Sequence, residues 1–254
     1  MGRDVSFRKR VRVGRGARDG WLGFTPDARQ AELLRGRFRR LILNCTRQWG
    51  KSTVTAAKAV DLAHSVAESL TLVLSPSARQ SGEFLRKAAG FVRRLGFRAR
   101  GDGDNEISLL LPNGSRIVGL PGTEATVRGF SAVSLMLIDE AARVSDELYL
   151  SMRPMLAVGD GDLWLMSTPH GKRGFFWDAW ENGGPEWTRV SAPATECPRI
   201  PAGFLEEERR AMGERWFRQE YLCEFVEAED AVFSREVVER AITEEVKPLW
   251  LGGG

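Results

Sequence analysis

The residues best suited to chemistry form a short loop between an apolar run and a helix-like segment. Cys45-Thr46-Arg47-Gln48-Trp49-Gly50-Lys51-Ser52 follows the apolar run 40–45 and leads into residues 52–67, whose composition is helical. The string matches G-x-x-x-x-G-K-[ST], except that Cys45 replaces the first glycine. In this pattern backbone N–H groups and a helix N-terminus surround phosphate oxygens. We therefore expect Lys51 at the β- and γ-phosphates of a nucleotide and the Ser52 hydroxyl on Mg²⁺. A chance Gly-Lys-Ser-Thr is the alternative, which the preceding apolar run disfavours.

A pair of adjacent acids ends a second apolar run. Residues 135–138 are all apolar, and Asp139 and Glu140 follow them directly. Asp139 is suited to hold Mg²⁺, directly or through water, and Glu140 to orient and activate an attacking water. The alternative is that the two acids cap the helix expected at 146–153. Together with the phosphate loop, the pair indicates hydrolysis of a nucleoside triphosphate, with ATP and Mg²⁺ as cofactors.

Two further segments suit a nucleotide site. In Phe24-Thr25-Pro26-Asp27-x-x-Gln30, the amide of Gln30 is able to pair with the N6/N7 edge of adenine, and Phe24 or Trp21 is suited to stack on the base. The alternative places Gln30 on an exposed helix face. Arg128 stands beside Gly129 ahead of the carboxylate strand, which suits an arginine finger that reaches a neighbouring subunit's γ-phosphate. A local backbone or acidic partner is the alternative for Arg128.

The elements that must position these residues alternate along the chain. Apolar runs predict strands at 40–45, 70–74, 133–138 and 163–166. Helical patterns occupy 52–67 and 77–95, and Asn113-Gly114 joins 107–111 to 116–118 in a predicted hairpin. This alternation predicts an α/β fold with a three-layer sandwich and a mainly parallel sheet.

The pattern changes toward the C-terminus, and it gives a predicted domain organisation. Residues 192–201 read as a loop, and 204–225 are helical with a break near Gly213. We predict three parts: a basic arm at 1–20, a nucleotide-binding core at 21–190, and a small helical lid subdomain with the start of a linker at 191–254.

Composition limits the class of protein. The chain has 254 residues, of which 43% are hydrophobic and 28% charged, as expected for one large globular domain or a domain with an appendage. Three scattered cysteines and two histidines are too few for a zinc cluster or a disulfide framework. The net charge is +3, with arginines concentrated in the first 20 residues. That arm is either solvated and disordered or contacts phosphates or a partner. No run is long enough to span a membrane, and we expect no membrane association and a cytoplasmic protein.

The loop string Cys-Thr-Arg-Gln-Trp-Gly-Lys-Ser-Thr resembles the deviant Walker A motif of phage and herpesvirus large terminases, in which Arg-Gln precedes x-Gly-Lys. The resemblance implies a RecA-like P-loop NTPase fold of the additional-strand (ASCE) class. It also implies that Arg47 senses the γ-phosphate in its own subunit, although a salt-bridged loop arginine is the alternative. Ser167 and Thr168 match the motif that couples hydrolysis to movement. The expected ATP-binding residues are Gln30, Arg47, Gln48, Trp49, Gly50, Lys51, Ser52 and Thr53.

The same resemblance implies a function, partners and a location. The expected function is ATP-driven translocation of double-stranded viral DNA into a procapsid, in the host cytoplasm at the portal. The expected partners are the portal protein, the small terminase subunit and further copies in a ring, typically a pentamer. Residues 217–225 resemble the stretch before the family's nuclease, and no nuclease activity is expected of this chain. The alternatives are a helicase-like translocase, which needs a second RecA-like domain, and a nucleotide-gated docking module without motor activity.

Overall fold

The computed structural model describes residues 20–104, 107–122 and 129–227, whose strands form one mixed sheet. The strand order is β3-β4-β2-β5-β6-β1-β7, and among these strands only the β3–β4 pair is antiparallel. The strands are β1 (Arg40–Cys45), β2 (Leu70–Ser75), β3 (Ser108–Leu110), β4 (Arg116–Pro121), β5 (Leu135–Asp139), β6 (Asp162–Ser167) and β7 (Thr188–Ala192). The predicted α/β fold with a mainly parallel sheet and a β3–β4 hairpin is thus confirmed.

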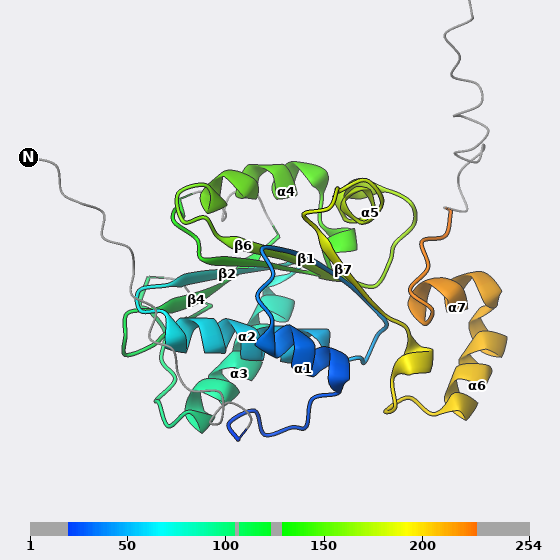
Figure 1. Cartoon of the computed structure of the whole chain (residues 1–254), viewed down its shortest axis with the longest axis horizontal. Coiled ribbons are helices and arrows are strands. Elements are labelled where there is room, and N and C mark those ends of the chain that lie inside the picture. The colour runs from blue at the N-terminus through cyan, green and yellow to red at the C-terminus, as the bar shows by residue number, and fades with distance from the viewer. Residues whose placement is uncertain (1–19, 105–106, 123–128, 228–254) are drawn as a thin grey trace, which may run out of the picture.

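Helices cover both faces of the sheet (Figure 1). Helices α1, α2 and α3 lie on one face, and α4 and α5 on the other. The helices are α1 (Ala28–Arg35), α2 (Lys51–Ser65), α3 (Ala78–Arg94), α4 (Asp146–Met152), α5 (Gly174–Glu181), α6 (Ala202–Met212) and α7 (Glu214–Glu220), and the 3₁₀ turns are η2 (Ala141–Arg143), η3 (Arg153–Leu156) and η4 (Ala194–Glu196). None of the described helices combines the length and the apolar character needed to cross a membrane.

The central strands are buried on both faces, which explains why their sequences are mostly apolar. Every residue of β5 is buried, and its side chains alternate between the two faces. Leu137 packs in the core beneath α2 and α3, whereas Ile138 packs in the core beneath α4 and α5. The helices add their apolar sides to these cores, as Phe84 of α3 and Phe176 of α5 show. The sheet is therefore well packed on both faces, and loops follow the carboxyl ends of its strands.

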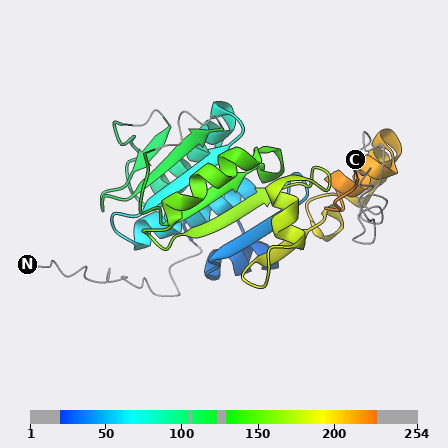
Figure 2. The ribbon, with the colours of Figure 1, turned by 90° about the horizontal axis from the view of Figure 1, so that it is seen from above.

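Helices α6 and α7 lie together beside the sheet edge at which β1 ends (Figures 1 and 2). Gly213 separates them with a φ of 79°, a left-handed value that suits glycine and explains the predicted break. The end of α7 contacts the strand end directly, because Asn44 Nδ2 donates to the Cys223 carbonyl at 2.8 Å and Thr46 Oγ1 to the Glu220 carbonyl at 2.9 Å. The helical pair is thus tied to the loop that follows β1.

The strand β7 was not predicted from the sequence. Its residues Thr188–Ala192 are mixed in polarity, and only the last of them is buried. Within the described sheet β7 is an edge strand that pairs with β1, so its sequence lacks the apolar run of a central strand. The predicted boundary between residues 190 and 191 falls within this strand, and the division into domains stays a prediction. Apart from Gly20, the predicted basic arm lies outside the described residues.

The side chain of Arg189 stabilises this edge strand through several hydrogen bonds, and a substitution can test their contribution. Its guanidinium donates to the carbonyls of Ala179, Trp180, Gly184 and Trp187, at the end of α5 and in the turn that follows. Arg189→Ala removes these donors and a positive charge at a helix C-terminus. We expect it to lower the free energy of unfolding by about 2–3 kcal/mol, typical of lost hydrogen bonds to a charged group. Urea denaturation is the measurement.

Arg86→Ala is the matched control, because Arg86 forms an exposed ion pair with Glu83 within α3. An exposed pair of this kind contributes less than about 1 kcal/mol. Equal losses of stability in the two variants would contradict the role assigned to Arg189.

Candidate active site

The loop between β1 and α2 has the backbone of a phosphate-binding loop. Gln48 and Gly50 have left-handed φ values of 63° and 94°, which turn the chain tightly before Lys51 begins α2. Cys45, in contrast, is the fully buried last residue of β1. Because this position is part of a strand, it does not require glycine, which explains the departure from the common motif. The strain of a non-glycine residue at Gln48, about 1–3 kcal/mol, is typical of functional sites.

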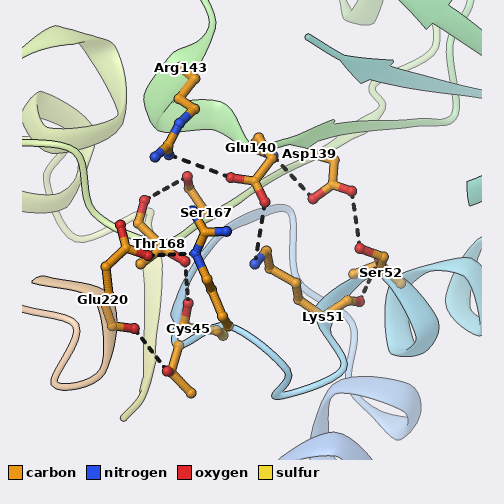
Figure 3. Close-up of polar contacts among 12 residues, drawn as sticks. Cys45, Lys51, Ser52, Asp139, Glu140, Arg143, Ser167, Thr168 and Glu220 are labelled. Carbon is orange, nitrogen blue, oxygen red and sulfur yellow. Dashed lines mark hydrogen bonds and ion pairs between the residues drawn. The ribbon is translucent and has the colours of Figure 1, made fainter. Parts of the chain in front are cut away.

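The ends of β1 and β5 bring Lys51, Ser52, Asp139 and Glu140 together (Figure 3). Ser52 Oγ donates to Asp139 Oδ2 at 3.1 Å. Lys51 Nζ lies 3.5 Å from Glu140 Oε1, and the Lys51 side chain is only 10% exposed. The strands bring the groups together because carboxyl ends of parallel strands share one edge of the sheet. The four residues that the two motifs predict are thus neighbours.

Asp139 and Ser52 form a donor set that fits Mg²⁺. Both offer hard oxygen atoms, and Mg²⁺ is usually held by one or two such protein groups together with phosphate oxygens. Burial raises the pKa of the Asp139 carboxyl, while Lys51 and the Ser52 hydroxyl act in the opposite direction. A divalent cation at this point would offset the cost of the buried charge. No group of three or more His, Cys, Asp or Glu side chains in the described ranges is arranged to hold a metal ion.

Glu140 has a strained backbone and two cationic neighbours. Its φ of 51° and ψ of 41° lie in the left-handed region, and its N–H donates to Asp139 Oδ1 at 3.1 Å. Arg143 lies on the side opposite Lys51, with its Nη1 3.8 Å from Glu140 Oε2. The carboxylate is thus directed between two cations, at the edge of the sheet where a nucleotide phosphate would bind. Arg143 belongs to none of the motifs that predicted the site.

Arg47 forms an ion pair, as its alternative interpretation predicted. Its Nε donates to Glu220 Oε2 at 2.6 Å, across 173 residues of sequence. The Glu220 side chain is only 11% exposed, so water screens the Glu220 end of the ion pair little. In this structure Arg47 therefore contacts the end of α7. The γ-phosphate role expected of Arg47 stays a prediction.

Gln30 is buried, which rules out its interpretation as an exposed helix residue. Its Nε2 donates to the Trp49 carbonyl at 2.8 Å, and its Oε1 accepts from the Asp27 N–H at 3.1 Å. Arg199 Nη2 also donates to the Trp49 carbonyl, at 2.6 Å. The amide of Gln30 thus stabilises the phosphate loop by binding its backbone at Trp49. Its contact with adenine stays a prediction.

The aromatic residues near the loop are part of the core. Trp21 and Phe24 pack against Phe91, with ring centroids 5.6 and 6.2 Å apart. The Trp49 side chain is also buried, at 2% exposure. Trp21 and Phe24 therefore already pack against a protein ring, and only the backbone of Trp49 is available to contact a nucleotide. Gln48 is exposed and Thr53 half-buried at the start of α2.

Ser167 and Thr168 connect the end of β6 to the phosphate loop. Thr168 Oγ1 donates to the Cys45 carbonyl at 3.2 Å, and Ser167 Oγ to the Thr168 carbonyl at 2.7 Å. Both side chains are buried, and β6 lies between β1 and β5 in the sheet. A shift of the phosphate loop would therefore be transmitted to the end of β6 through the Thr168–Cys45 hydrogen bond. Their coupling role stays a prediction.

Arg128, the predicted finger, lies outside the described residues. Three further residues of the site have no motif of their own: Arg143, Arg199 and Glu220. Arg199 and Glu220 contact the loop from 150 and 173 residues away, so no local pattern signals them. Arg143 lies three residues after Glu140, and its positive charge beside the acid pair was the one available signal.

Comparison with known proteins gives a consistent picture. The family model described as terminase large subunit, T4likevirus-type, N-terminal, matches residues 42–240. The large terminase subunit of Escherichia phage T5 is 23% identical over 168 residues, covering 64% of this chain and 38% of that protein. The large terminase subunit of Thermus virus P23-45 is 25% identical over 248 residues, covering 84% of this chain and 51% of its own length. The chain thus spans about half or less of these curated relatives.

Solved structures show the same fold. The large terminase ATPase domain of Thermus phage P74-26 superposes with a TM-score of 0.72 at 21% identity, covering 81% of this chain and 96% of that one. The large terminase of another thermophilic bacteriophage, in complex with ADP, gives a TM-score of 0.65 at 14% identity, covering 78% of this chain and 53% of that one. At these identities the similarity establishes the fold alone.

Proposed function

This chain belongs to the family of T4-like-virus-type terminase large subunits, matching its N-terminal part, and on that premise we propose that it hydrolyses ATP to drive double-stranded viral DNA into a procapsid. One observation carries the proposal: Lys51, Ser52, Asp139 and Glu140 meet at one edge of the sheet. These are the groups that phosphoryl transfer to water requires.

The residues divide the work of hydrolysis. The phosphate loop and Lys51 hold the β- and γ-phosphates, whose oxygens replace the Glu140 carboxylate as the partner of Lys51. Glu140, released from Lys51, orients a water for attack on the γ-phosphorus and accepts its proton. The bond from the γ-phosphorus to the β,γ-bridging oxygen breaks, and the products are ADP and inorganic phosphate. Ser52 and Asp139 would hold Mg²⁺, which neutralises charge on the phosphates. The left-handed backbone at Glu140 directs its carboxylate toward this edge of the sheet.

Arg47 changes partners in this proposal. In the structure it pairs with Glu220, and a γ-phosphate offers it a stronger anionic partner a few residues from Lys51. ATP binding would then break the contact between Arg47 and α7. Because the Glu220 carbonyl also accepts from Thr46, the end of α7 keeps one link to the loop when the ion pair is lost.

Relatives support nucleotide binding and a role in packaging. The large terminase of a thermophilic bacteriophage has been solved with ADP and with ATP-gamma-S. We extend binding of ATP with Mg²⁺ to this chain on the geometry of its own site. We further propose double-stranded DNA, the portal protein, the small terminase subunit and a ring of like subunits as partners, at the portal in the host cytoplasm. The described residues contain one sheet, and no observation favours a helicase or a docking module over this function.

Lys51→Ala is expected to weaken Mg·ATP binding by about 10- to 100-fold, from the ~1.5–3 kcal/mol of a hydrogen bond to a charged group. Lys51 is the only cationic residue in the first turn of α2, so no neighbour on that turn replaces its charge. Isothermal titration calorimetry measures the affinity.

Lys87→Ala is the matched control, since Lys87 is exposed on α3. It removes the same charge and should leave affinity unchanged. Unchanged affinity in Lys51→Ala itself would overturn the assignment of the phosphate loop.

A further inference from the structure

A cavity lies next to the turn that follows Glu140, and one of its lining residues is Arg143, which approaches Glu140 from the side opposite Lys51. It has a volume of about 410 Å³ and lies between the start of α4 and the loop from β6 to α5. Arg143, His170 and Arg173 line it together with Asp146. Its size falls in the ~300–1,000 Å³ range of small-ligand pockets. None of the residues expected to bind ATP lines it.

The two guanidinium groups of this cavity lack strong acidic partners. Arg143 lies 3.8 Å from Glu140, an ion pair longer than a hydrogen bond. In the part of the chain that the structure describes, Arg173 forms no ion pair, and its Nη2 lies 2.8 Å from His170 Nε2. Because an arginine nitrogen only donates, His170 Nε2 accepts and the ring is neutral. Both arginines thus have hydrogen-bonding capacity left for an anion.

The acid that lines the cavity is already engaged. Asp146 Oδ1 accepts from the Phe175 N–H at 2.8 Å, at the N-terminus of α5. Asp146 keeps its negative charge, but the two arginines outnumber it among the residues that line the cavity. The pKa of His170 is lowered by burial and then by Arg143 and Arg173, with Glu220 acting weakly in the opposite direction. Burial is the largest cause of this shift, and the two arginines act in the same direction, as a positive local potential does.

We propose that this cavity is a second phosphate-binding site, separate from the phosphate loop, in which Arg143 and Arg173 bind the oxygens of one phosphate group and His170 contacts it from the side. Planar guanidinium groups match phosphate oxygens in bidentate fashion. The ligand is a phosphate group, either a phosphodiester of a nucleic-acid backbone or free inorganic phosphate. Binding at this site does not depend on ATP hydrolysis.

The two histidines of the chain make the site directly observable by NMR. We expect added inorganic phosphate to raise the pKa of His170, since a bound anion favours the protonated ring. His64 is the internal reference, because it packs against Phe97 on the opposite side of the sheet and outside the cavity. The full chain is used both as wild type and with Lys51→Ala, which weakens binding at the phosphate loop. The same His170 response in both separates this site from the proposed ATPase site.

Arg173→Gln is the test variant, and Lys172→Gln is its matched control. Lys172 is the adjacent cation, but it pairs with Glu227 and does not line the cavity. We expect Arg173→Gln to weaken phosphate binding about tenfold or more, and Lys172→Gln to change it less than about twofold. A short DNA duplex and an uncharged peptide nucleic acid duplex of the same sequence distinguish the sources.

The outcomes are distinct. A His170 response to inorganic phosphate and to DNA, lost in Arg173→Gln, supports the site with a nucleic-acid backbone as ligand. A response to inorganic phosphate alone supports it with the free anion as ligand. Absence of any His170 response, an equal response of His64, or an unchanged response in Arg173→Gln overturns the proposal.

Discussion

Glu140→Gln is expected to slow ATP hydrolysis by about 10²- to 10⁴-fold, the range for loss of a general base. Glutamine has nearly the same shape, so the left-handed backbone at this position and its link to Asp139 should persist. Mg·ATP should still bind, because Lys51, Ser52 and Asp139 are unchanged. Steady-state phosphate release measures the rate, and calorimetry measures the affinity.

Glu147→Gln is the matched control, since it removes an exposed carboxylate from the next helix, α4. It should hydrolyse ATP at the wild-type rate. If Glu140→Gln retained near-normal turnover, another residue would orient the water. If the wild-type chain bound ATP without hydrolysing it in any assembly, a nucleotide-gated docking module would explain the site better.

The central part of the fold and site was predictable because its signals are local. The strands β1 and β5 are mostly apolar; β5 ends in Asp139, and β1 is followed within six residues by Lys51. A strand buried on both faces tolerates few polar residues, and a phosphate loop needs a fixed spacing between strand and helix. Lys51, Ser52, Asp139 and Glu140 could therefore be brought together from the sequence alone.

The residues that surround this centre were less predictable because long-range contacts position them. Arg199 and Glu220 reach the loop only because α6 and α7 lie beside the end of β1. Gln30 resembles an exposed helical residue in sequence, but its side chain is held between the loop and the Asp27 backbone. No pattern in a single segment encodes such contacts, since both partners must first be placed by the fold.

Arg47 and Arg128 are expected to act on the nucleotides of different subunits. Loss of Arg128 is expected to have the largest effect on the rate. Arg47 is fixed within the loop, a few residues from Lys51, and its partner Glu220 belongs to the same chain. We therefore expect Arg47 to act on its own subunit's nucleotide. Arg128 is expected to reach the nucleotide of a neighbouring subunit, as an arginine finger that contributes about 10³–10⁵ in rate.

Mixing variants tests this assignment. Arg128→Ala and Glu140→Gln should each be nearly inactive, but their mixture should regain hydrolysis measurable as phosphate release. In mixed rings, a Glu140→Gln subunit supplies its finger to an Arg128→Ala neighbour that keeps its base. Arg128→Ala should also bind ATP with nearly unchanged affinity, because the finger belongs to another subunit's site.

Arg47→Ala is the matched control in the same experiment. If Arg47 acts within its own subunit, a Glu140→Gln neighbour has nothing to supply to an Arg47→Ala site, and this mixture should stay inactive. Rescue of Arg47→Ala but not of Arg128→Ala would reverse the two roles. An inactive Arg128→Ala mixture, with co-assembly of the two variants shown by a tag on one of them, would remove Arg128 as a finger that acts between subunits. In that case Arg143, whose Nη1 lies 3.8 Å from Glu140 Oε2, becomes the candidate cation from the same chain.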